Sequence, residues 1–164
     1  MKLGLADDIE ICTVYRGRTD CDPDNSWDDV RVSVRYVVDL PKGLRLRATT
    51  GNGDALVMQT LAEVDAATGN GDIVIRESLG RVTASTGNGD DTVAAANGPV
   101  KASTGNGRII ANTALGPVDA STGNGDVEVK MGSIPQDVTS MSFTTGNGVV
   151  RVTLPANFNG EIDA

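Results

Sequence analysis

Residues 68–89 read Thr-Gly-Asn-Gly-Asp-Ile-Val-Ile-Arg-Glu-Ser-Leu-Gly-Arg-Val-Thr-Ala-Ser-Thr-Gly-Asn-Gly, so this segment begins and ends with the same tetrapeptide. The tetrapeptide occurs six times, starting at Thr50, Thr68, Thr86, Thr104, Thr122 and Thr145. The first four intervals are each 18 residues, and the fifth is 23 residues, which places an insertion near Ser133–Thr139. A constant period of this kind indicates a repeat architecture.

Each repeat contains two short segments in which apolar and polar residues alternate. In one repeat these are Asp72–Arg76 and Arg81–Ser85, with a turn at Ser78–Gly80 between them. Alternation with a period of two is typical of strands, and two glycines in every repeat disfavour a helix. The residues expected to point inward include Val64, Val82, Val100 and Val118, and Ala66, Ala84, Ala102 and Ala120. We therefore predict an all-β fold, a single-stranded β-helix or β-solenoid with 18-residue rungs, about six of them, over residues 49–164.

The asparagine of the tetrapeptide is expected to stack from rung to rung. Stacked identical amides can hydrogen-bond along a ladder, and the adjacent glycines supply positive φ at the corners. The expected ladder consists of Asn52, Asn70, Asn88, Asn106, Asn124 and Asn147. The motif is therefore interpreted first as structural.

Residues 1–48 lack the repeat and are expected to form a β cap over the N-terminal end of the solenoid. Cys12 and Cys21 are separated by eight residues, which favours a disulfide that closes a hairpin. Two unrelated thiols are the alternative. A disulfide indicates an oxidising compartment, so we expect an extracytoplasmic location: secreted, periplasmic or at the cell surface.

The last residues, Gly160-Glu-Ile-Asp-Ala164, match Gly116-Pro-Val-Asp-Ala120, which leads into a Thr-Gly-Asn-Gly turn. The repeat therefore ends in mid-rung. We expect either a piece of a longer protein or an open end that pairs with another chain, and self-association is one outcome.

The composition limits the partners and the chemistry. The formal net charge is −8, which argues against nucleic acid as a partner. The chain has no histidine, and therefore lacks the commonest general base and metal ligand. No apolar run approaches the ~20 residues that a membrane-spanning helix needs, so an integral membrane protein is not expected. A nucleophile paired with a base is not visible, and we identify no catalytic residue.

The segment Val38-Asp-Leu-Pro-Lys-Gly-Leu-Arg-Leu-Arg-Ala-Thr-Thr-Gly-Asn-Gly-Asp54 resembles a bacterial adhesin family of unknown-function domains. Thr145-Gly-Asn-Gly-Val-Val-Arg-Val-Thr-Leu-Pro155 is similar to the closing rungs of that family. The resemblance spans about residues 30–164. It implies a β-helix at the cell surface or in the periplasm, and it implies no catalytic residues.

Two acidic groups are candidates for calcium. Asp20, Asp22 and Asp24 alternate in one loop that also contains Asp28, and alternate carboxylates can converge on Ca²⁺. A solvated acidic loop is the alternative, because Arg31 stands where a bidentate Glu is expected. The second group follows the Gly-Asn-Gly turns, at Asp54, Asp72, Asp90 and Asp126, with Arg108 in the fourth place. No cofactor other than Ca²⁺ is expected.

Leu56, Val74 and Ile110 share one outward register and form a candidate contact stripe. Coverage by the N-terminal strands or Trp27 is one interpretation, and contact with a partner or a second copy is the other. Asp91 falls at an inward position for which the sequence offers no explanation.

These features favour a non-enzymatic, extracytoplasmic structural or binding module: an adhesin, an envelope scaffold or a self-associating filament subunit. Its expected partners are a second copy at the open end, another surface protein or a glycan. The alternative is a Ca²⁺-dependent carbohydrate-binding or lyase-like β-helix protein.

Overall fold

The computed structural model describes residue 37 and residues 43–113, 115–136, 138 and 140–164. The chain divides into two units, Met1–Asp39 and Leu40–Ala164. Most of the predicted cap, residues 1–36 and 38–42, lies outside the described residues, and so do the predicted Cys12–Cys21 disulfide and the acidic loop with Asp20, Asp22, Asp24 and Asp28. The sequence placed the boundary between residues 48 and 49, but the first strand of the solenoid begins earlier, at Leu46.

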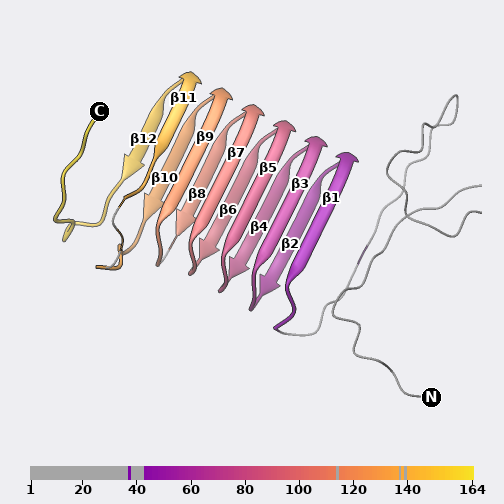
Figure 1. The fold of residues 1–164 in the computed structure, drawn as a ribbon, viewed down its shortest axis with the longest axis horizontal. Coiled ribbons are helices and arrows are strands. Elements are labelled where there is room, and N and C mark those ends of the chain that lie inside the picture. Colours follow the sequence, from indigo (N-terminus) through magenta and orange to yellow (C-terminus); the bar gives the residue numbers. More distant parts are fainter. Residues whose placement is uncertain (1–36, 38–42, 114, 137, 139) are drawn as a thin grey trace, which may run out of the picture. The chain divides into compact units, whose positions relative to one another are not determined.

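All the described elements are β-strands, and they form two six-stranded parallel sheets. Sheet A contains β1 (Leu46–Asn52), β3 (Val64–Asn70), β5 (Val82–Asn88), β7 (Val100–Asn106), β9 (Val118–Asn124) and β11 (Phe143–Asn147). Sheet B contains β2 (Ala55–Thr60), β4 (Ile73–Ser78), β6 (Asp91–Ala96), β8 (Ile109–Thr113), β10 (Val127–Met131) and β12 (Val150–Thr153). The chain alternates between the sheets, so that each pair β1–β2, β3–β4 and onward forms one rung (Figure 1). The predicted β-solenoid with 18-residue rungs is confirmed.

The register between rungs follows the sequence period. Val64 pairs with Val82, and Ala66 pairs with Ala84. The insertion lies in the connection between β10 and β11, and the register is recovered beyond it, where Phe143 pairs with Ala120. Chemically equivalent side chains therefore stack in columns along the solenoid.

The core lies between the two sheets and is built from the inward residues of both. Val64 and Val82 of sheet A and Ile73, Ile75 and Ile109 of sheet B have no exposed surface. Burial of each such side chain stabilises the fold by roughly 1.5–3 kcal/mol. Columns of valine, isoleucine and alanine thus replace the aromatic residues that are scarce in this chain.

The first corner of each rung is the Gly-Asn-Gly turn, and from the second rung onward its glycines are required for two reasons. Gly89 adopts a φ of 147°, a conformation that L side chains rarely adopt. Gly87 has an ordinary φ, but a Cβ atom at this position would lie 2.5 Å from the Gly69 carbonyl oxygen of the preceding rung. The close stacking of the rungs therefore excludes a side chain at both positions.

The second corner lies where the sequence predicted a turn, at Ser78–Gly80 in the second rung, but the left-handed residue before it was not foreseen. Gln59, Glu77 and Ala95 have φ values of 55°, 57° and 54°, although none is glycine. They recur every 18 residues near the ends of β2, β4 and β6. Between β6 and β8 the register shifts from Ala94 to Ala96. In each of the first three rungs, a left-handed residue therefore lies where the chain turns at the second corner. In the fourth rung, β8 is one residue shorter than β6.

Candidate functional site

The six asparagines of the tetrapeptide form a continuous hydrogen-bonded ladder. In each step the amide Nδ2 of one asparagine donates to Oδ1 of the asparagine in the preceding rung, at 2.8–2.9 Å. Asn147 in the last rung donates to Asn124, and its own Oδ1 faces the position that a next rung would occupy. The ladder is therefore directional: it presents an acceptor at its C-terminal end.

The aspartates after the turns also bond from rung to rung. Asp54 Oδ1 accepts a hydrogen bond of 2.9 Å from the backbone N–H of Asp72, and Asp72 accepts one of 2.8 Å from Asp90. Asp90 accepts one of 2.7 Å from Arg108. Arg108 offers no carboxylate to Asp126, which occupies the same position in the next rung, so the series is interrupted at this rung. Each stacking aspartate thus satisfies a main-chain donor of the next rung.

This arrangement bears on the second calcium candidate. One carboxylate oxygen of Asp54, Asp72, Asp90 and Asp126 is engaged by a main-chain N–H of the next rung. Within the described part of the chain, no three Asp, Glu, Cys or His residues gather as a group that could hold a metal ion. These aspartates therefore have a structural explanation, and the acidic loop at Asp20–Asp28 lies outside the described residues.

The apolar stripe lies on the outer face of sheet B as expected from its register. Leu56 pairs with Val74, and Ile110 occupies the same column beyond Thr92. Leu56 is 65% exposed, whereas Val74 and Ile110 are half-buried. Glu128 continues the column, so the apolar surface is confined to the first four rungs.

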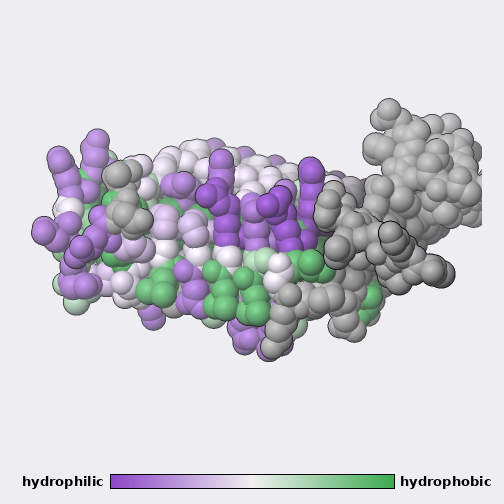
Figure 2. Space-filling view, turned by 60° about the horizontal axis from the view of Figure 1, so that its bottom comes forward, coloured by the Kyte–Doolittle hydropathy of each residue, from purple (hydrophilic) through white to green (hydrophobic). Residues whose placement is uncertain are grey.

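Three exposed leucines add to the apolar surface at the second corner. Leu61, Leu79 and Leu115 are 47%, 52% and 51% exposed, and Asn97 takes the place between the last two. Figure 2 turns this corner toward the viewer and shows a group of apolar side chains below a band of polar ones. These leucines were not predicted as part of the contact stripe, although their spacing by multiples of the 18-residue period could have identified them.

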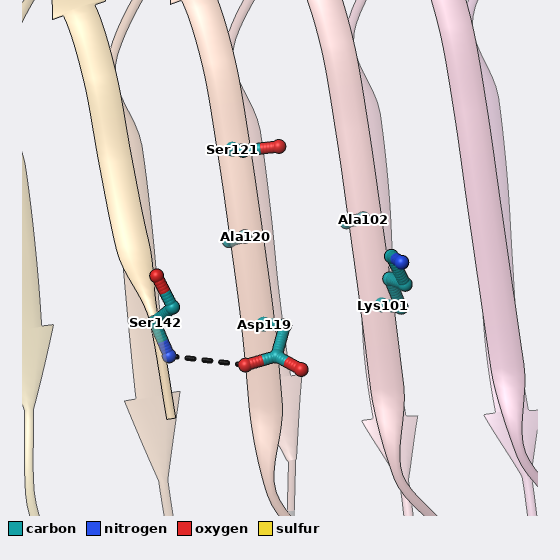
Figure 3. Close-up of a pocket in the computed structure, with 6 residues that line it drawn as sticks. All are labelled: Lys101, Ala102, Asp119, Ala120, Ser121 and Ser142. Carbon is teal, nitrogen blue, oxygen red and sulfur yellow. Dashed lines mark hydrogen bonds between the residues drawn. The ribbon is translucent and has the colours of Figure 1, made fainter. Parts of the chain in front are cut away.

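The outer face of sheet A is polar and carries a shallow hollow of about 250 Å³. Lys101, Asp119, Ser121 and Ser142 line it together with Ala102 and Ala120 (Figure 3). The backbone N–H of Ser142 donates to Asp119 Oδ1 at 3.0 Å, which ties the connection after β10 to β9. An ammonium group, a carboxylate and two hydroxyls thus lie on adjacent rungs.

The last rung exposes the interior of the solenoid. Among the described strands, β11 pairs only with β9, and β12 pairs only with β10, so both are edge strands of these sheets. Val150 is 40% exposed, whereas Val127, its partner one rung earlier, is fully buried. In the rung before, the N–H of Val127 donates to the Val149 carbonyl at 2.9 Å. By the same geometry the N–H of Val150 points away from β10, toward the open side of the edge.

Asp91 lies in the core, in the column of Ile73 and Ile109. It has no exposed surface, and neither carboxylate oxygen has a hydrogen-bond partner among the described residues. Burial raises the pKa of Asp91 to about 7. The sequence identified the position as unusual, but only the structure shows that the carboxyl is unpartnered.

Comparison of the chain with protein-family models, with curated proteins and with solved structures finds no match. The resemblance to the adhesin family therefore stays a prediction. None of the described segments is a helix with the length and apolar character that a membrane crossing requires.

Proposed function

We propose that this chain is a non-enzymatic structural module that acts outside the cytoplasm and self-associates through the edge formed by β11 and β12. The single observation that carries the proposal is the last rung, where Val150 is 40% exposed and no further strand of the described residues lies beside the main-chain groups of β11 and β12. An unpaired edge is a template for another strand. The partner that we assign to it is a second copy of the chain.

The direction of the ladder favours a head-to-tail arrangement. Asn147 presents the acceptor Oδ1 at one end, and among the described residues Asn52 uses only its own Oδ1, as the acceptor for Asn70. A first rung placed on β11–β12 would let the Asn52 amide donate to Asn147 and continue the column. This arrangement requires the expected N-terminal cap to leave the β1–β2 edge open to a second copy. Contacts of this kind join unlike surfaces and produce open chains of subunits. The proposal therefore specifies a filament rather than a closed dimer.

The extracytoplasmic location is supported by sequence features alone. Cys12 and Cys21 have the spacing of a disulfide, and disulfides persist in oxidising compartments. The resemblance to surface-located β-helices points in the same direction. Intact mass of unreduced protein tests this part of the proposal, since two free thiols would contradict it.

Replacement of Val150 by proline tests the edge directly. Proline removes an N–H that points to the open side and that no inner rung uses, so the fold is expected to survive while strand addition is blocked. Val150→Thr is the matched control, because it keeps the N–H and the β-branched shape. Sedimentation velocity over a range of concentrations should show association of the wild type and of Val150→Thr, and monomers of Val150→Pro.

Two results would contradict the proposal in different ways. If the wild type remains monomeric at every concentration, the edge does not associate. If it forms a dimer that does not grow further, two C-terminal edges meet each other, and the head-to-tail arrangement is wrong.

The hollow on sheet A favours glycan binding as a second candidate function. Lys101, Asp119, Ser121 and Ser142 offer donors and acceptors that match a polyhydroxylated ligand. A glycan screen with and without Ca²⁺, using wild type and Lys101→Ala, tests it. Binding lost in Lys101→Ala supports this site, whereas equal binding by the two proteins excludes it.

A further inference from the structure

Asp91 is the only charged side chain among the fully buried residues that the structure describes. Its register partners on either side are Ile73 and Ile109, so an apolar column is interrupted by a carboxyl group. Neither oxygen is hydrogen-bonded to a described residue. An ionised carboxylate in such a place is strongly disfavoured unless it is paired.

The described groups around Asp91 do not supply a counter-charge. The inward residues of the four neighbouring strands are uncharged: Ile73 and Ile75 on β4, Ile109 and Ala111 on β8, Ala84 and Thr86 on β5, and Ala102 and Thr104 on β7. The ionisable groups of these strands and corners are Asp72, Arg76, Glu77, Arg81, Asp90, Lys101 and Arg108, and all of them are exposed outside the core. Burial is the main cause that raises the pKa of Asp91 to about 7. The backbone of Ser103, which is near the carboxyl but does not meet hydrogen-bonding geometry, opposes the shift, and the charges of Asp90 and Asp72 add to it.

The stack is also irregular next to Asp91. The register between β6 and β8 shifts at Ala94 and Ala96. Thr113, at the end of β8, has a buried hydroxyl without a hydrogen-bond partner among the described residues. Arg108 interrupts the series of aspartates that accept main-chain N–H groups of the next rung. The third and fourth rungs therefore contain buried polar groups that lack hydrogen-bond partners among the described residues.

We propose that Asp91 makes the third rung a proton-sensitive break point of the solenoid. While the carboxyl is neutral, β6 stays packed between β4 and β8. When the carboxyl loses its proton, the rung must either hold an unpaired charge in the core or open to water, and it opens locally.

The pH dependence has a definite sign. The ordinary pKa of an aspartate is 3.8, and in the folded protein the value is about 7. Below the lower value Asp91 is protonated in both states and does not destabilise the fold. As pH rises toward 7, the unfolded state loses this proton before the folded state does. The unfolding equilibrium constant therefore rises by about tenfold per pH unit, and the protein becomes less stable. Above the higher value the loss is complete and constant.

Urea denaturation of the full chain between about pH 4 and pH 8.5 tests the proposal through the difference between the wild type and Asp91→Asn. The two proteins should have similar stability at the acidic end of this pH range. At the basic end, the unfolding equilibrium constant of Asp91→Asn should be lower than that of the wild type by about a hundredfold or more. Asp91→Val, which copies Val127 in the same column, should behave in the same way. Glu128→Gln, at an exposed carboxylate on β10 that is not among the groups acting on Asp91, should keep the wild-type pH dependence.

Hydrogen exchange, corrected for the intrinsic effect of pH, locates the break point. Amides of β4, β6 and β8 should lose more protection between about pH 5.5 and pH 8 than those of β1 and β3, and Asp91→Asn should remove the difference. A stability difference that does not change with pH, or a uniform loss of protection, would overturn the proposal. If neither variant folds, carboxyl ¹³C shifts of the wild type decide, because titration of Asp91 near its ordinary pKa would also overturn it.

Discussion

Within the tetrapeptide, asparagine and glycine stabilise the stack in different ways. Each inner asparagine takes part in two ladder bonds, one as donor and one as acceptor, as Asn88 does with Asn70 and Asn106. The first glycine makes room for the carbonyl of the preceding rung. The asparagine therefore contributes bonds, whereas the glycine permits the distance at which those bonds form.

Asn88→Ala removes two side-chain hydrogen bonds from the middle of the ladder. Because a hydrogen bond contributes about 0.5–1.5 kcal/mol net, we expect a loss of about 1–3 kcal/mol in the free energy of unfolding, measured by urea denaturation. Asn112→Ala is the control, since Asn112 is exposed on sheet B outside the ladder, and it should change stability by less than about 0.5 kcal/mol. Equal effects of the two substitutions would contradict a role for the ladder.

The glycines provide a second test with an internal control. At Gly87 an added Cβ would meet the Gly69 carbonyl oxygen at 2.5 Å, whereas at Gly51, in the first rung, it would meet nothing within 4 Å. Gly87→Ala should therefore destabilise the protein by about 2 kcal/mol or more through overpacking, and Gly51→Ala should leave the melting temperature nearly unchanged. If the two variants have the same melting temperature, the rungs do not approach each other as closely at Gly87 as the structure shows.

At the scale of strands and corners, the sequence predicts the columns well and the corners only in part. The alternation of apolar and polar residues and the 18-residue period together place Val82 and Ile75 in the core, because both patterns can be recognised along the sequence. The left-handed residue before the second corner is not predictable, since Glu77 has no sequence preference for positive φ. The bond from Asp72 to the N–H of Asp90 depends on a contact between rungs, and the sequence pattern therefore indicated only a stripe of charges. The unpartnered state of Asp91 likewise depends on packing from both sheets.

Ala95 tests the second corner. Its φ of 54° is unfavourable for alanine by about 1 kcal/mol and natural for glycine. Ala95→Gly should therefore raise the free energy of unfolding or leave it unchanged, whereas Ala94→Gly, at an adjacent position inside the strand, should lower it by about 0.5–1 kcal/mol. Denaturation by urea compares the two, and a larger loss for Ala95→Gly would contradict the corner geometry.

For the molecule as a whole, the repeat explains stacking, and the places where the repeat changes point to function. The columns of Asn, Thr and Asp are occupied by bonds between rungs, as shown by Thr86, whose hydroxyl donates to the Gly71 carbonyl at 2.9 Å. The surfaces left over are the apolar stripe, the hollow at Lys101 and the edge at β11–β12. Of these, the edge has the most specific geometry, because it repeats the surface that every inner rung uses to bind the next.

Electron microscopy of the full chain at high concentration tests this account most directly. If rungs of a second copy add to β11–β12, the wild type should form unbranched particles one solenoid wide, of variable length, and Val150→Pro should not form them. Single particles of uniform length in the wild type, or filaments that persist in Val150→Pro, would contradict growth through this edge.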